Sequence, residues 1–263
     1  MKYVLVTGAY GGMGSSVVKA LCAQGYHVFA LDRQVGEAQD GVTPIRADIS
    51  DMQSIEEACQ KVAAITPKLY AILHFAGIYM LDSLVEMPSE KLQQIFAVNV
   101  LGAAQINKVF MPMLDRDSRI LMTTSELAPL DPLPFTGIYA VTKGALDKYA
   151  YSLRMELQLL DIQVSVLRAG AVKTGMLGIS TEALQRFVQS TQLYQCNAVR
   201  FERIVDSVEA RHIPPEKLAE KVIRILKKRK AKFAYTINRN PLLWLLNLLP
   251  HRLQFRIIRM ILQ

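Results

Sequence analysis

The chain has 263 residues, of which 51% are hydrophobic, and its formal net charge is +8. This length and composition suit one α/β domain, residues 1–263, with a large core, and they argue against disorder or two domains joined by a linker. The positive charge gathers late, in the run 227–232 and at Arg252, Arg256 and Arg259, which predicts a basic C-terminal surface and argues against nucleic-acid binding. The three cysteines have an odd count and no metal-like spacing, so we expect a cytoplasmic protein with neither a disulfide framework nor a metal site.

The N-terminal segment predicts a nucleotide-binding turn. An apolar run at 3–6 indicates a buried strand, a glycine-rich turn follows it, and a helical pattern begins after the turn. This order presents backbone N–H groups and the positive end of a helix to a pyrophosphate, whereas the alternative is an ordinary tight turn. The cofactor contacts that we predict in this turn are Gly8, Tyr10, Gly11, Gly12, Met13 and Gly14.

The next two strands predict the adenosine end of the site. A strand at 28–31 ends at Asp32, eighteen residues after Gly14. A carboxylate at this spacing accepts hydrogen bonds from the ribose hydroxyls and repels a 2′-phosphate, which favours NAD over NADP. Arg33 argues the other way, because a guanidinium accommodates that phosphate, and Asp32 has the alternative role of a strand-end turn residue. A third strand near 44–46 leads to Asp48 and Ile49, where Asp48 either contacts the adenine or caps the loop.

Two further segments bring polar or small residues to the same region. A strand at 70–75 ends in Ala76 and Gly77, whose small size suits the close passage of a nucleotide, and His74 in this strand is expected to be structural. A long helical pattern from Pro88 to Leu114 carries Asn99 on an otherwise apolar stripe. Asn99 is therefore either a buried structural amide or part of a proton path.

The segment 124–143 holds the groups that suit acid/base chemistry. A strand at 119–124 brings in Ser125, and a helix that opens at Gly137 places Tyr139 and Lys143 four residues apart on one face. We expect the ammonium to lower the pKa of the phenol, so that Tyr139 exchanges a proton with a substrate oxygen to which Ser125 donates a hydrogen bond. The alternative is a half-buried tyrosine beside a lysine that extends to solvent. After a strand at 163–168, we predict further cofactor contacts at Gly170, Val172 and Thr174.

The C-terminal third predicts a lid and a tail. Residues 175–213 lack a strand period and stand as an insertion after a strand, which is typical of a substrate lid, whereas a helix at 214–228 and a strand at 232–237 complete the sheet. Pro250 divides the tail 241–263 into two helical pieces, each too short to span a bilayer. We expect the basic face of the second piece to lie opposite Leu253, Ile257 and Ile261. A substrate flap or an oligomer contact is favoured for this tail, with an interfacial membrane helix as the alternative.

Residues 3–240 resemble the short-chain dehydrogenase/reductase family. Gly8, Gly12 and Gly14 match its cofactor turn, Asp32 its NAD-selecting acid, Asp48 its adenine contact, and the catalytic tetrad matches Asn99, Ser125, Tyr139 and Lys143. The resemblance implies a doubly wound, seven-stranded parallel sheet, the Rossmann fold, with helices on both faces. It also implies that Tyr139 is the acid/base, that Lys143 binds the nicotinamide ribose and lowers the pKa of Tyr139, that Ser125 polarises the substrate oxygen, and that Asn99 holds a water.

Two departures from the family pattern stand beside this match. The family's Asn-Asn-Ala-Gly segment is His74-Phe75-Ala76-Gly77 here, and its Pro-Gly pair is Ala169-Gly170. They support the alternative of a non-catalytic NAD-binding regulator, although the intact tetrad favours an enzyme. The tail resembles the hydroxysteroid and retinol dehydrogenase branch, which implies a lipophilic secondary alcohol or ketone as substrate and a homodimer or homotetramer; a small polar carbonyl compound is the alternative substrate.

Overall fold

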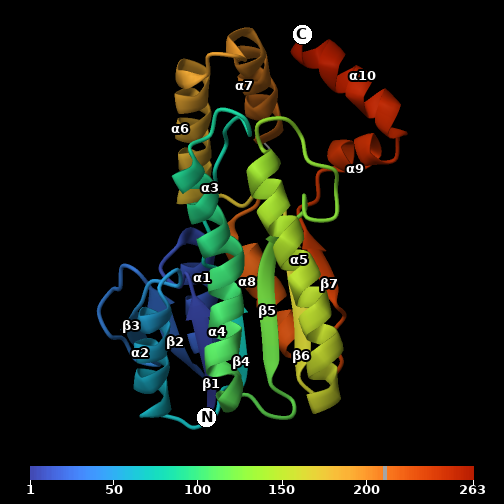
Figure 1. The fold of residues 1–263 in the computed structure, drawn as a ribbon. Helices are drawn as coiled ribbons and strands as arrows, with labels where there is room; N and C mark the ends of the chain where they lie inside the picture. Colours follow the sequence, from blue (N-terminus) through green and yellow to red (C-terminus); the bar gives the residue numbers. More distant parts are fainter. Residues whose placement is uncertain (210–211) are drawn as a thin grey trace.

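The computed structural model describes residues 1–209 and 212–263, and it gives only the backbone of 175–181 and 206–209. The described residues form a parallel seven-stranded sheet with helices on both faces, as the resemblance implied (Figure 1). Its strands are β1 (Lys2–Thr7), β2 (Tyr26–Asp32), β3 (Val42–Arg46), β4 (Ala71–His74), β5 (Arg119–Ser125), β6 (Gln163–Ala169) and β7 (Ala234–Ile237).

The strand order is β3-β2-β1-β4-β5-β6-β7, so the direction of winding reverses between β1 and β4. These two strands pair in register from Val4 with Ala71 to Thr7 with His74. The loops that follow β1 and β4 therefore leave the sheet side by side, at the carboxyl ends of the two strands. A reversal of this kind opens a crevice in which ligands bind in doubly wound sheets.

The helices that cover the sheet bury one apolar stripe each. In the part of the chain that the structure describes, α1 (Gly12–Cys22) and α8 (Pro215–Leu226) cover one face. The other face is covered by α2 (Met52–Ala63), α4 (Ala103–Phe110) and α5 (Gly137–Leu157). Val17 and Val222 are fully buried under the first pair, and Ile55 and Phe110 under the second set. Helices thus shield both faces of the sheet from solvent, which agrees with the continuous apolar runs of its central strands.

The predicted helix 88–114 is interrupted. It consists of α3 (Ser89–Phe96), a π-helical segment η1 (Ala97–Gly102), α4 and a short 3₁₀ turn η2 (Met111–Met113). Among the described residues, the run Ser89–Met113 is long and apolar enough to cross a membrane by length and composition. Ile95, Ile106 and Phe110 of this run have no exposed surface, so one of its faces packs in the core, whereas Leu92 and Leu101 are exposed.

The remaining helices lie at the carboxyl end of the sheet (Figure 1). The predicted lid contains α6 (Gly175–Ser190) and α7 (Gln195–Glu209), and the tail forms α9 (Pro241–Asn247) and α10 (His251–Leu262), divided at Pro250 as expected. A third apolar cluster fastens this end together, with Phe135 at its centre against Phe187 and Phe201.

The buried side of the second tail helix does not coincide with its apolar pattern. The sequence places Leu253, Ile257 and Ile261 opposite the basic face, and of these Leu253 and Ile261 are exposed. The buried side chains of α10 are Gln254 and Leu262. The physical reason is that polar contacts from other parts of the chain orient the helix, as described below.

Candidate active site

The glycine turn between β1 and α1 leaves no room for side chains. Gly8 has a φ of +66°, which L-residues rarely adopt, and a Cβ there would collide with the backbone of Ala76. A Cβ on Gly14 would collide with the carbonyl of Gly8. The turn is therefore closed on itself, and the bare backbone at the start of α1 faces the crevice between β1 and β4.

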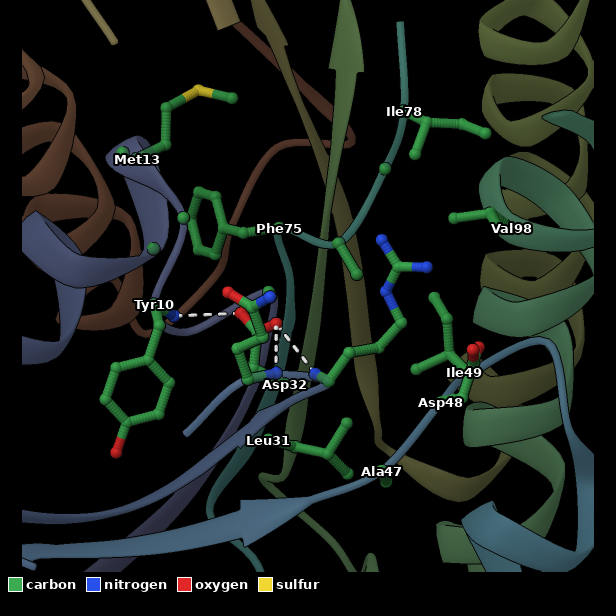
Figure 2. Close-up of a pocket in the computed structure, with 18 of the residues that line it drawn as sticks. Tyr10, Met13, Leu31, Asp32, Ala47, Asp48, Ile49, Phe75, Ile78 and Val98 are labelled. Carbon is green, nitrogen blue, oxygen red and sulfur yellow. Dashed lines mark hydrogen bonds between the residues drawn. The ribbon is translucent and has the colours of Figure 1, made fainter. Parts of the chain in front are cut away.

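A cleft of about 750 Å³ occupies this crevice. Figure 2 shows Tyr10, Met13 and Phe75 on one side of it and Ile49, Ile78 and Val98 on the other. The predicted cofactor residues that line the cleft are Gly8, Tyr10, Gly11, Gly12, Met13, Gly14, Asp32, Arg33, Asp48, Ile49, Ala76, Gly77 and Thr174. These residues fit a nicotinamide dinucleotide, because a turn that has no room for a Cβ at Gly8, Gly12 or Gly14 brings bare backbone close to a pyrophosphate. Carboxylates stand farther along the cleft.

The two carboxylates of the cleft are held by local hydrogen bonds. Asp32 accepts from the backbone N–H of Tyr10 at 3.0 Å and from that of Arg33 at 2.7 Å (Figure 2). Asp48 accepts from the backbone and the hydroxyl of Ser50, at 2.9 and 2.6 Å. Asp48 therefore caps its loop, which was one of its two predicted roles, and it also lines the cleft.

Four of the predicted cofactor contacts are not among the residues that line this cleft: Tyr139, Lys143, Gly170 and Val172. Gly170 lies against the chain that follows β7, because a Cβ there would collide with the carbonyl of Asn238. Val172 is buried in the apolar cluster beneath α1 and α8. Both residues support the loop after β6, whereas Thr174 of the same loop reaches the cleft beside Gly12.

Asn99 joins three segments at the inner end of the cleft. It lies in the π-helical segment, and its Oδ1 accepts from the backbone N–H of Ile78 at 2.8 Å. Its Nδ2 donates to the Ile78 carbonyl at 2.9 Å and to Thr142 Oγ1 at 3.2 Å. Asn99 is 1% exposed and its amide is hydrogen-bonded at both ends, so it is a buried amide with partners, and its predicted part in a proton path stays a prediction.

Ser125 and Tyr139 meet as predicted. Ser125 ends β5 and is buried, and its hydroxyl accepts from the backbone N–H of Leu127 at 3.2 Å. Tyr139 lies in the first turn of α5, where a hydrogen-bonding interaction with Ser125 lowers its pKa. The ring of Tyr79 packs against that of Tyr139 with centroids 4.9 Å apart. Tyr79 was missed from the sequence, where an aromatic residue two positions after Gly77 carries no recognisable signal.

Lys143 completes the group on the same face of α5. Its side chain is buried, its Nζ donates to the carbonyl of Thr123 at 3.2 Å, and the same atom lies 5.7 Å from the centre of the Tyr139 ring. Burial lowers the pKa of Lys143 to about 8. A Cβ on Gly77 would come within 3.4 Å of Nζ and 3.2 Å of Asn99 Oδ1, so Gly77 connects the cleft to these two residues.

The pKa of Tyr139 lies above its ordinary value, and the expected lowered pKa is wrong. We expected the ammonium to lower the pKa of the phenol, but the pKa of Tyr139 is raised. Burial is the largest cause, Tyr79 raises the pKa further, and the interaction with Ser125 only partly offsets both. The phenol of this structure is therefore protonated at neutral pH.

His74 is structural, as expected. It is 3% exposed, and its Nε2 lies 2.9 Å from Asn107 Oδ1, which places the ring proton on that nitrogen. Burial, as the largest cause, lowers the pKa of His74 to about 4, and the hydrogen bond to Asn107 opposes this shift.

The family model of short chain dehydrogenases matches residues 2–185. The chain belongs to this family. A curated relative, an uncharacterised oxidoreductase YbbO of Escherichia coli K12, is 29% identical over 270 residues, which cover 98% of this chain and 94% of the relative. The protein is accordingly an oxidoreductase of the short-chain dehydrogenase family.

Two other relatives have named substrates. An NADPH-dependent 1-acyldihydroxyacetone phosphate reductase of Schizosaccharomyces pombe is 29% identical over 69% of this chain and 65% of its own length. Estradiol 17-beta-dehydrogenase 2 of Mus musculus is 31% identical over 67% of this chain and 50% of its own length. Among solved structures, a short chain dehydrogenase family protein from Francisella tularensis superposes with a TM-score of 0.75 at 22% identity, over 90% of this chain and 97% of that one, and so shares the fold.

Proposed function

We propose that this short-chain dehydrogenase is an NAD(H)-dependent enzyme that interconverts a secondary alcohol and a ketone on a lipophilic substrate. The observation that carries the proposal is the meeting of Ser125 and Tyr139, with Lys143 on the same helix face. Gly77, which lines the cleft that fits a dinucleotide, lies next to Lys143. A bound nicotinamide supplies or accepts the hydride.

The side chains then perform the proton chemistry. In the reducing direction, Tyr139 donates its phenolic proton to the developing alkoxide, and the raised pKa of Tyr139 keeps that proton in place until the substrate oxygen needs it. Ser125 donates a hydrogen bond to the same oxygen and so stabilises its negative charge. Lys143, with a pKa of about 8, is mostly charged at neutral pH and stabilises the phenolate that remains.

Asp32 supports NAD(H) as the cofactor. Its carboxylate lines the cleft at the end of β2. A carboxylate at this place accepts hydrogen bonds from the ribose hydroxyls of NAD(H) and repels the 2′-phosphate of NADP(H). Arg33 and Arg46 line the same part of the cleft and favour the phosphate of NADP(H), as does the NADPH-dependent yeast relative. We assign more weight to Asp32, because its carboxylate is fixed by the N–H groups of Tyr10 and Arg33.

A steroid-like or retinoid-like compound is the proposed substrate class. The half-buried ring of Tyr79 packs against Tyr139, and next to it lies the apolar cluster of the lid helices with Leu81 and Phe135. An apolar surround of this kind favours a lipophilic substrate over a polyol or sugar. The similarity to estradiol 17-beta-dehydrogenase 2 points in the same direction.

The test is NADH oxidation, followed by absorbance, with a panel of steroid ketones, retinal and small polar ketones. Turnover on the lipophilic members is the expected result. Turnover confined to the small polar ketones would contradict the substrate class. NADH binding with no turnover on any compound would favour a regulator, for which Phe75 in the cleft wall is the structural support.

A further inference from the structure

Helices α9 and α10 hold large apolar side chains in solvent. Eight such side chains are each at least 43% exposed, and we call them the tail surface: Leu242, Trp244, Leu245, Leu248, Leu253, Phe255, Met260 and Ile261. Four lie on α9 or its end and four on α10. Exposed apolar side chains in this number on two short helices indicate an interaction surface.

The tail is fastened in this orientation by polar contacts. The backbone N–H of Asp131, in the loop before α5, donates to Asn247 Oδ1 at 2.6 Å, and its carboxylate accepts from Gln254 at 3.4 Å and pairs with His251 at 3.3 Å. At the far end, Asn197 of α7 donates to the Leu262 carbonyl at 2.7 Å. The tail surface therefore faces away from the lid helices, and folding it over the cleft as a flap requires the loss of these contacts.

The charged side chains of the C-terminal segment itself have one sign, and the carboxylate of Asp131 lies beside them at His251. The last 43 residues, from Lys221 to Gln263, include eleven Lys or Arg and no Asp or Glu. Arg252, Arg256 and Arg259 are exposed and form one stripe on α10, beside Leu253 and Met260. Apolar side chains bordered by arginines complement a layer with a negatively charged surface and an apolar interior.

A second copy of this chain complements the tail surface less well. Association through the same patch on both copies brings the arginine stripes toward each other, and residues 221–263 supply no carboxylate side chain to pair with them.

The length of the helices favours a position on the surface of a bilayer. Since α9 has 7 residues and α10 has 12, neither spans roughly 30 Å of hydrocarbon.

Trp244 has the position of an interfacial residue. Its ring is 43% exposed, and the guanidinium of Arg239 lies 5.2 Å from its centre. Tryptophan prefers the headgroup level of a bilayer, where one part of the indole contacts water and the other contacts apolar groups.

We propose that α9 and α10 dock this protein on the surface of a bilayer that contains anionic lipid. The proposal concerns binding alone and does not depend on the proposed substrate.

The single tryptophan makes the test direct, because the chain has only Trp244. The full-length protein is mixed with vesicles of phosphatidylcholine or of equal parts phosphatidylcholine and phosphatidylglycerol. With the mixed vesicles we expect a blue shift of the Trp244 emission, quenching by lipids with brominated chains, and reversal by high salt. An unchanged spectrum with no co-flotation on mixed vesicles would overturn the proposal.

Paired variants separate the apolar and the charged contributions. The double variant Leu242→Ser with Leu245→Ser removes two exposed apolar side chains of α9. Its control is Leu159→Ser with Leu160→Ser, because these two leucines are also exposed and lie in the short turn directly after α5. Only the first pair should lose vesicle binding. Equal loss in both pairs would show that the tail surface is not the contact.

The charge pair is Arg252→Gln with Arg256→Gln, and its control is Lys19→Gln with Lys61→Gln, which are exposed in the last turns of α1 and α2. The arginine pair should lower partitioning into mixed vesicles by roughly twentyfold, and the lysine pair by much less. The proposal is wrong if the parent protein does not bind vesicles and light scattering shows a dimer that Leu242→Ser with Leu245→Ser disrupts. In that case the tail surface joins two copies of the chain.

Discussion

The amide of Asn99 donates to Thr142 Oγ1 at 3.2 Å and thereby ties the π-helical segment to α5, one residue before Lys143. Because the same side chain holds both backbone groups of Ile78, it fixes the cleft wall relative to the helix that carries Tyr139. The position of Tyr139 thus depends on a side chain that lies outside the lining of the cleft.

Asn99→Ala should lower the free energy of unfolding by about 3 kcal/mol, because it leaves buried polar groups of Ile78 and Thr142 without their partner. Urea denaturation measures the loss. Thr142→Val, which keeps both bonds to Ile78, should cost about 1 kcal/mol. A neutral Asn99→Ala variant would show that the amide does not hold these segments together.

Gly14→Ala should abolish detectable NADH binding, since its Cβ would collide with the carbonyl of Gly8 and force the turn open. Gly11→Ala is the matched control, because its Cβ would lie 3.3 Å from the same carbonyl and needs only a small adjustment. Titration of NADH fluorescence measures both. Equal affinities in the two variants would contradict the assignment of this turn to the cofactor.

Asp32→Asn should shift cofactor preference toward NADP(H) by roughly tenfold or more. The two N–H groups of Tyr10 and Arg33 bind different carboxylate oxygens, so the amide keeps an oxygen for one of them. It removes the negative charge that repels a 2′-phosphate, while Arg33 and Arg46 remain in the cleft. Dissociation constants for NADH and NADPH measure the preference. If both constants change by the same factor, Asp32 does not select the cofactor.

His74 should make the protein acid-sensitive. Its folded pKa of about 4 lies below its ordinary value of 6.5, so the unfolded chain binds the proton more readily between these values. The stability that His74 contributes is complete above pH 6.5 and declines as the pH falls toward 4, by about 3 kcal/mol in total.

His74→Gln should remove this share of the acid sensitivity, and His27→Gln, a histidine on the same sheet, should leave it in place. Free energies of unfolding in urea from pH 7 to pH 4 compare the three proteins. Parallel pH dependences for the parent and His74→Gln would show that His74 does not remain neutral in the folded state.

The sheet was predictable because its determinants are local. Apolar runs such as Val4–Val6 identify buried strands, and the glycines after β1 identify the turn, so the cleft and the order of its residues followed from patterns along the chain. The position of Ser125 against Tyr139 followed in the same way, since one ends a strand and the other begins the next helix.

The features that escaped prediction depend on distant contacts. A π-helical segment changes the backbone hydrogen-bond pattern but leaves the apolar stripe of Ile95 and Ile106 in place. The sequence pattern therefore gave no sign that Asn99 lies in such a segment. The orientation of α10 is fixed by Asp131, far away in sequence, which overrides the apolar pattern of the helix itself. The raised pKa of Tyr139 depends on burial, which spacing from Lys143 does not reveal.

The central claim is that Tyr139 exchanges the proton. The most direct measurement is the single-turnover rate of NADH oxidation with a ketone that the parent protein accepts, for Tyr139→Phe and for Tyr151→Phe, an exposed position on the same helix. We predict a loss of at least roughly a hundredfold for Tyr139→Phe with NADH binding retained, and an unchanged rate for Tyr151→Phe. A Tyr139→Phe variant that oxidises NADH at the parent rate would contradict the account.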